Sequence, residues 1–214
     1  MPKVRVLLAD DHTVVVEGLR ALLKDNFDLV GVVHDGRALL EAAEKHRPDV
    51  IVTDISMPLM NGLDAVRQIR SRRPDAKVIV LTMHRDTQLA AEAFRAGVSG
   101  YVLKVSPTEE LVTAIREVAQ GRSFLTSLMA KDLITLLIEA GKHPKQDQSS
   151  PLTPRQREVL QLIAEGQTMK EVASILKISP RTAESHKYEI MQVLGLQNTA
   201  ELIQYALRSK LISE

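Results

Sequence analysis

The sequence has 214 residues, which is enough for one large domain or two small ones. It contains no cysteine, which excludes disulfide bonds, thiolate metal sites and a cysteine nucleophile. Lysine plus arginine number 28 and aspartate plus glutamate 27, so net charge gives no support to a nucleic-acid partner.

We expect neither a membrane segment nor a leader. Its apolar runs reach only four residues, as at 78–81, against the ~20 that a bilayer-spanning helix needs. The first three residues, Met-Pro-Lys, lead directly into a strand-like run, so no signal peptide is expected. We therefore expect a cytoplasmic protein with no membrane partner.

The first 120 residues alternate between strand-like and helical segments. The strands are expected at 4–9, 29–33, 50–53, 77–82 and 100–103, and the helices at 13–24, 37–47, 62–72, 86–96 and 107–120. Strands that are apolar on both faces, each followed by a helix, predict a parallel sheet covered on both sides. Five such units predict an α/β fold, a flavodoxin-like doubly wound five-stranded sheet. Ser106 is expected to cap the last helix, with Pro107 in its first turn.

After Gly121 the alternation ends. Residues 124–140 have the pattern of one amphipathic helix, and residues 141–151 contain no apolar side chain, which predicts a flexible linker. Helix start signals then follow at Thr153, Thr168, Ser179 and Asn198. We expect a first domain at 1–121, a linker helix and flexible linker at 122–151, and a small all-α domain of four helices at 152–214.

Polar side chains follow several of the predicted strands. Asp10 and Asp11 end the first strand, Asp54 ends the third, Thr82 ends the fourth, and Lys104 follows the fifth. Ligands of a doubly wound sheet bind at this edge. Three carboxylates repel one another unless a cation lies between them, and oxygen ligands suit Mg2+. A carboxylate can also attack phosphorus and form an aspartyl phosphate, whose oxygens the metal, an ammonium and a hydroxyl would neutralise.

Each of these residues alone is ordinary, because aspartate at a strand end more often caps a helix or forms a turn. Their placement on four strands favours a functional site. Together with Met57-Pro58, Gly62 and Tyr101, they resemble the receiver domain of two-component response regulators over residues 4–121.

The resemblance implies that Asp54 accepts a phosphoryl group from a sensor histidine kinase. It also implies a Mg2+ site formed by Asp10, Asp11, Asp54 and the main-chain carbonyl of Ser56.

The resemblance further implies roles for three residues around the phosphoryl group. Lys104 would bridge to it, while Thr82 would move to it and Tyr101 would swing inward behind Thr82. Many receivers have proline after the lysine, whereas this chain has Val105, so the isomer of that peptide bond stays open.

The third helix of the tail has two distinct faces at 100° per residue. A core face is expected from Ala183, His186, Ile190, Val193 and Leu194. The opposite face, flanked by Lys187, carries Arg181, Glu184, Ser185, Tyr188 and Gln192. A short helix and a three-residue turn precede it, which is the helix-turn-helix arrangement, and its exposed face could enter a DNA major groove. A helix face that is only exposed to solvent and binds no DNA would show the same spacing of polar residues.

The stretch Leu-Thr-Pro-Arg-Gln-Arg-Glu-Val-Leu at 152–160, with Ala-Glu-Gly at 164–166 and Lys-Glu-Val-Ala at 170–173, resembles the LuxR-type DNA-binding domain over 152–210. With the receiver it gives the architecture of NarL/FixJ-type response regulators. The resemblance implies a scaffold helix at 168–176, a recognition helix at 180–194 and a dimerisation helix at 198–209. Family members commonly carry lysine where this chain has Glu184, so the family's base contacts are not carried over there.

We therefore expect a phosphorylation-controlled transcription factor rather than an enzyme. Its expected partners are a sensor histidine kinase, double-stranded DNA and a second copy of the chain. One alternative is a phosphohydrolase of the haloacid-dehalogenase type, but that type uses an Asp-x-Asp on its first strand and would not need residues 152–210. Another is a DNA binder that ignores phosphorylation or a regulator that acts through a protein partner, which Glu184 keeps open.

Overall fold

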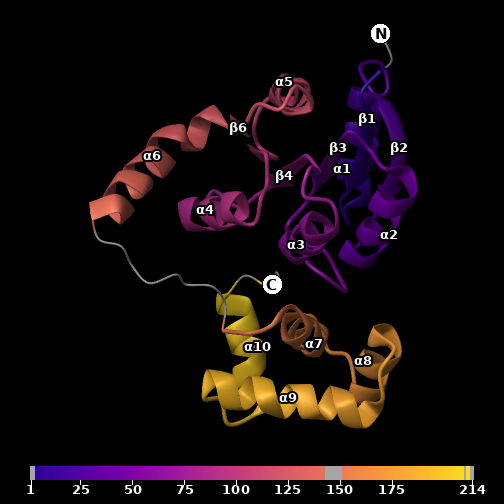
Figure 1. Ribbon diagram of the computed structural model, residues 1–214, viewed down its shortest axis with the longest axis vertical. Coiled ribbons are helices and arrows are strands. Elements are labelled where there is room, and N and C mark those ends of the chain that lie inside the picture. Colours follow the sequence, from indigo (N-terminus) through magenta and orange to yellow (C-terminus); the bar gives the residue numbers. More distant parts are fainter. Residues whose placement is uncertain (1–2, 143–150, 210, 213–214) are drawn as a thin grey trace. The chain divides into compact units, whose positions relative to one another are not determined.

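The computed structural model describes residues 3–142, 151–209 and 211–212. The chain forms two compact units, which separate between residues 144 and 145. The colours of Figure 1 follow the sequence, so the first unit runs from indigo to salmon and the second from orange to yellow. Most of the flexible linker predicted at 141–151 lies outside the described residues. None of the described helices is both long enough and apolar enough to cross a membrane.

The first unit is built on a parallel sheet in the order β2-β1-β3-β4-β5-β6. The sequence predicted five strands, and that count was wrong by one: a short sixth strand lies beside β5, with Phe124 opposite Gly100 and Leu125 opposite Tyr101. The six strands are β1 (Arg5–Ala9), β2 (Asp28–Val33), β3 (Val50–Thr53), β4 (Val78–Thr82), β5 (Gly100–Leu103) and β6 (Phe124–Leu125).

Helices cover both faces of this sheet, as the apolar strands predicted. On one face, Val6 and Leu8 of β1 pack in one cluster with Leu23 and Ile115 from the first and fifth helices. On the other, Gly31 of β2 lies against Leu7 and a side chain of the second helix. The five helices that alternate with the strands are α1 (Thr13–Leu23), α2 (Gly36–His46), α3 (Gly62–Arg72), α4 (Thr87–Arg95) and α5 (Thr108–Ala119).

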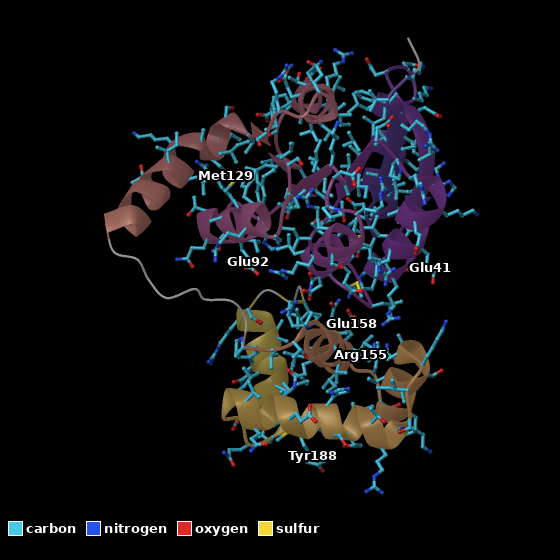
Figure 2. All side chains as sticks on the ribbon, in the orientation of Figure 1. Glu41, Glu92, Met129, Arg155, Glu158 and Tyr188 are labelled. Atoms are coloured by element: carbon cyan, nitrogen blue, oxygen red, sulfur yellow. The ribbon has the colours of Figure 1, made fainter. Side chains whose placement is uncertain are left out.

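The region after α5 belongs to the first unit. The single helix predicted at 124–140 begins later, at Ser127, because Phe124 and Leu125 form β6 first; the helix is α6 (Ser127–Lys142). Met129 and Leu133 on α6 are buried, and α6 contacts α4. Figure 1 shows α6 running beside α4, and Met129 is labelled on that side of α6 in Figure 2.

The cap predicted for α5 was also wrong. The helix begins at Thr108 with no side-chain cap. The Ser106 hydroxyl instead lies 2.9 Å from the Thr126 hydroxyl, just before α6.

The second unit consists of α7 (Pro154–Ala164), α8 (Met169–Leu176), α9 (Pro180–Leu194) and α10 (Thr199–Arg208). All four predicted start signals are confirmed. Thr153 and Thr168 form complete capping boxes, and Ser179 and Asn198 accept amide hydrogen bonds from the next turn. The three residues between α8 and α9 include Lys177 in the left-handed conformation, with φ of 53°, which makes the sharp turn of a helix-turn-helix.

The core of the second unit lies where α9 faces the other three helices (Figure 1). Ala183 and Ile190 of α9 are buried in the same cluster as Leu202 and Ala206 of α10. The predicted core face of α9 is thus confirmed at its centre, but Val193 is 50% exposed and does not belong to it. His186 is half-buried, with Nδ1 3.4 Å from a carboxylate oxygen of Glu189.

Candidate functional site

The carboxyl edge of the sheet brings three of the predicted polar residues into contact. Asp10 follows β1, Asp54 follows the neighbouring β3, and Lys104 follows β5; Asp10 is 1% exposed and Asp54 4%. The Lys104 Nζ lies 2.7 Å from Asp10 Oδ2 and 2.6 Å from Asp54 Oδ2. One ammonium therefore bridges two buried carboxylates.

The charges at this edge do not balance. Burial raises the pKa of Asp54, and the nearby Lys104 only partly offsets that effect. Burial alone would lower the pKa of Lys104, but Asp54 and Asp10 outweigh it, so that pKa is raised and the ammonium stays charged. Two buried carboxylates share a single ammonium, and a bound cation would add a second positive charge beside them.

The donor atoms needed for such a cation are close together. Asp10, Asp11, His12 and Asp54 each offer a ligand atom, and all these atoms lie within 4.8 Å of one another. Three of the four are hard carboxylate oxygens, the donors that Mg2+ prefers. The residues present fit that ion.

Backbone groups fix the two buried carboxylates. The Ile55 amide donates to Asp54 Oδ1 at 2.6 Å, and the His12 amide donates to Asp10 Oδ1 at 2.9 Å. Gly62, at the start of α3, approaches the Asp54 carbonyl so closely that a Cβ there would lie 1.8 Å from the oxygen. Only glycine fits at this position, and the contact holds the β3–α3 loop against Asp54.

Thr82 and Tyr101 are both fully buried and are joined through His84. The His84 amide donates to Thr82 Oγ1 at 3.2 Å, and the Tyr101 hydroxyl donates to the His84 carbonyl at 2.9 Å. Burial, with the charges of Asp86 and Asp54, raises the pKa of Tyr101 and keeps its phenol neutral. Tyr101 occupies an inward position in this structure.

The face of α9 opposite the core is polar and largely exposed. Arg181, Ser185, Tyr188 and Gln192 are exposed, and Glu184 and Lys187 are half-buried. Figure 2 shows Tyr188 on the side of α9 away from α7. The Ser185 hydroxyl donates to the Arg181 carbonyl at 3.0 Å. No ion pair joins Arg181 to Glu184 in the described part of the chain.

Two family models match the chain, one for each unit. Residues 6–116 match the response regulator receiver domain, which covers more than half of the sequence. Residues 150–206 match the bacterial regulatory proteins of the luxR family. The chain is a two-component response regulator with a LuxR-type DNA-binding domain.

Regulators of the same architecture align with nearly the whole chain. The transcriptional regulatory protein MctR of Rhizobium johnstonii is 37% identical over 215 residues, covering 100% of this chain and 97% of MctR. The oxygen regulatory protein NreC of Staphylococcus carnosus is 36% identical over 214 residues, covering 97% and 99%.

Among solved structures, the RcsB response regulator of Salmonella typhimurium is 29% identical with a TM-score of 0.62, covering 98% of each chain. A structure of an RcsB–DNA complex is 30% identical with a TM-score of 0.59, covering 95% of this chain and 97% of that one.

The structure of this response regulator also places the remaining predicted site residues. Asp11 is exposed at the acidic cluster. The Ser56 hydroxyl lies 3.2 Å from the His84 ring nitrogen Nε2, while the Mg2+ role expected of the Ser56 carbonyl stays a prediction. Among the described residues no peptide bond is cis, so the bond between Lys104 and Val105 is trans.

Sequence reasoning missed two histidines of the receiver. His12 directly follows the aspartate pair, so its position next to the acidic cluster could have been noticed. His84 joins Thr82 to Tyr101 through its backbone, and any residue type except proline could make those two contacts. No sequence signal therefore pointed to it.

Proposed function

We propose that this response regulator accepts a phosphoryl group on Asp54 and thereby controls DNA binding by α9. One observation carries the proposal: Asp54 is a buried carboxylate at the end of β3, 2.6 Å from Lys104 Nζ and beside Asp10 and Asp11. Its Oδ1 already accepts the Ile55 amide. The phosphoryl donor in the cytoplasm would be a sensor histidine kinase.

Each residue of the site has a separate role in this transfer. Asp10, Asp11, Asp54 and the Ser56 carbonyl would hold Mg2+, which supplies positive charge to the phosphoryl oxygens. Asp54 would attack phosphorus through one carboxylate oxygen and displace the donor's leaving group. Lys104 would exchange its contact with Asp54 for one with the phosphoryl group, and the Thr82 hydroxyl would donate to the same group.

The acceptor is tested by the intact mass of the full chain after treatment with acetyl phosphate and Mg2+. We expect a gain of one phosphoryl group in the natural protein and none in Asp54→Asn. Asp11→Asn serves as the matched variant: Asp54 should still be labelled, but more slowly and with Mg2+ affinity reduced about ten-fold, because one carboxylate fewer attracts the ion. Equal labelling of Asp54→Asn would show that another residue is the acceptor.

For the second unit we propose that α9 lies in the major groove and contacts DNA through Arg181, Glu184, Ser185, Lys187, Tyr188 and Gln192. The exposed polar face and the turn at Lys177 support this. Selection of bound sequences from random duplex DNA, with and without acetyl phosphate, would identify the site and its dependence on phosphate. A regulator that ignores phosphorylation, the alternative that Glu184 keeps open, would select the same sequences equally well in both conditions.

We further propose that a homodimer forms on DNA through α10. Deleting α10 would not test this, because Leu202 and Ala206 are buried in the core of the second unit. The exposed positions Ala200 and Gln204 offer a cleaner test. Ala200→Glu should abolish cooperative binding to paired half-sites while leaving the far-ultraviolet circular dichroism unchanged. Persistent cooperativity in both Ala200→Glu and Gln204→Glu would place the dimer contact elsewhere.

A further inference from the structure

Helix α6 is anchored to the receiver at its N-terminal end. The Thr126 amide donates to the Tyr101 carbonyl at 2.9 Å, which continues the pairing of β6 with β5. The buried Thr126 hydroxyl lies 2.9 Å from Glu110 Oε2 and 2.9 Å from the Ser106 hydroxyl, and the other oxygen of Glu110 accepts the Ser127 amide at 3.1 Å. These contacts are buried or mutually supporting, so this end of α6 is a fixed point.

A second attachment holds the next turn of α6 and is much weaker. Arg85 Nη2 donates to the Leu128 carbonyl at 3.1 Å and lies 3.8 Å from Asp132 Oδ2. The side chains of Arg85 and Asp132 are 61% and 58% exposed, so water screens their attraction. A contact of this kind is broken by a small displacement of either partner.

Arg85 follows His84, the residue that joins the buried Thr82 and Tyr101. His84 contacts Thr82 through its amide, Tyr101 through its carbonyl and Ser56 through its ring. Ser56 follows Asp54 by two residues, and Thr82 ends β4 at the same sheet edge. A continuous set of contacts therefore leads from the neighbourhood of Asp54 through His84 to Arg85, and from Arg85 to α6.

We propose that Arg85 is a positioning residue that couples the state of Asp54 to α6, an inference that rests on the proposed phosphorylation of Asp54. When the Thr82 hydroxyl turns to the phosphoryl group, its contact with the His84 amide changes and residues 83–85 shift. Arg85 then loses the Leu128 carbonyl and Asp132. The first turns of α6 loosen, while the Thr126 anchor and the buried Met129 and Leu133 keep the helix attached.

The consequence reaches the second unit through the chain itself. Helix α6 is the described element that precedes the DNA-binding unit in sequence. A change in how firmly α6 is held therefore acts on the last described element of the receiver unit before the DNA-binding unit. Arg85 thereby gives the phosphoryl group an effect beyond the receiver sheet without any contact of its own with Asp54.

The test is amide hydrogen exchange of residues 127–135 in the full chain, with and without acetyl phosphate and Mg2+. The intact mass of the same samples reports the phosphorylation of Asp54. In the natural protein we expect phosphorylation to raise exchange in this segment about two- to five-fold, the range of a weak exposed contact. Arg85→Ala should show the raised rate before phosphorylation and little further change after it, with an unaltered phosphorylation yield.

Arg95→Ala is the matched control, because Arg95 is an exposed arginine on α4 whose hydrogen bond goes to Ala91 in the same helix. It should behave as the natural protein, and Arg85→Lys should restore part of the coupling. The proposal is overturned if α6 exchange is unchanged when Asp54 carries a phosphoryl group, or if Arg85→Ala matches Arg95→Ala. An unchanged intact mass would mean that Asp54 is not phosphorylated, and both the proposed function and this proposal would then fail. A raised mass without the expected difference in exchange would overturn the role of Arg85 alone.

Discussion

The side chains of the receiver's carboxylate site contact one another, whereas those on the polar face of α9 are largely exposed to solvent. At the receiver site, the side chains of Asp10, Asp54 and Lys104 are buried, and the Lys104 ammonium lies within 2.7 Å of both carboxylates. On α9, Arg181, Tyr188 and Gln192 are exposed, and the described residues include no ion pair from them to the rest of the unit. The residues of the first site already contact one another within the chain, whereas the α9 face presents its polar side chains to solvent.

Replacing Lys104 should cause the largest loss of unfolding free energy among these predictions. A small loss would contradict the inference that the receiver site depends on contacts within the chain. Lys104→Met removes the only ammonium in contact with Asp10 and Asp54 among the described residues. Removing one partner of a buried ion pair costs roughly 3–5 kcal/mol, because the other charge is left uncompensated. We expect a loss of about 3 kcal/mol in the free energy of unfolding, measured in urea by circular dichroism.

Two further measurements identify the cause of that loss. Mg2+ should restore part of the stability of Lys104→Met, because a cation can replace the missing ammonium between the carboxylates. Adding Asp54→Asn to Lys104→Met should restore part of it without metal. If neither treatment helps, the loss is one of packing and the site is less dependent on internal charge balance than we infer.

Two glycines of the receiver allow a direct comparison of a position with no room for a Cβ and a position with ample room. A Cβ at Gly62 would meet the Asp54 carbonyl at 1.8 Å, whereas a Cβ at Gly18, within α1, would meet nothing within 4 Å. Gly62→Ala should therefore cost about 1–3 kcal/mol of unfolding free energy and slow the labelling of Asp54.

Gly18→Ala is the matched substitution and should raise the unfolding free energy by about 0.5–1 kcal/mol, because alanine favours a helix interior. Its labelling rate should equal that of the natural protein. Equal stability losses in both variants would mean that the close approach of Gly62 to Asp54 does not hold the site.

The sequence predicted those parts of the receiver in which apolar residues recur with the period of a strand or a helix. Strands that are buried on both faces and helices with an apolar stripe could be located to within a few residues, and their order placed Asp10, Asp54 and Lys104 at one edge. The strand β6 was missed because two residues, Phe124 and Leu125, cannot show a period. Its only signal is the pairing with β5, which is a tertiary contact.

Predictions from short sequence patterns were wrong where contacts distant in the sequence determine how a side chain is used. Ser106 has the sequence context of a helix cap, but its hydroxyl bonds to Thr126, which is 20 residues away. Val193 has the spacing of a core residue, but its side chain is 50% exposed, whereas Ala183 and Ile190 on the same helix are fully buried. His84 joins Thr82 to Tyr101 through its backbone amide and carbonyl, so no side-chain pattern could reveal that link.

The smallest expected effect tests the α9 face, where this chain departs from its family at Glu184. A carboxylate near DNA is repelled by phosphates but can accept a hydrogen bond from the N4 amino group of cytosine. Pairing with Arg181 is the other route to specificity, and the structure gives it no support, since no ion pair joins the two in the described residues. We therefore expect Glu184 to act directly on the base and to lower affinity for random DNA.

Glu184→Lys should strengthen binding to random duplex DNA and narrow the gap between selected and random sequences. The salt dependence of binding should steepen by up to about one ion, because one more phosphate contact becomes possible. Glu184→Gln is the graded control: it removes the repulsion without adding a phosphate contact, so its salt slope should stay close to the natural one. Affinities for both DNAs at two salt concentrations decide the matter, and an unchanged ratio of selected to random binding in Glu184→Lys would show that Glu184 faces solvent and reads no base.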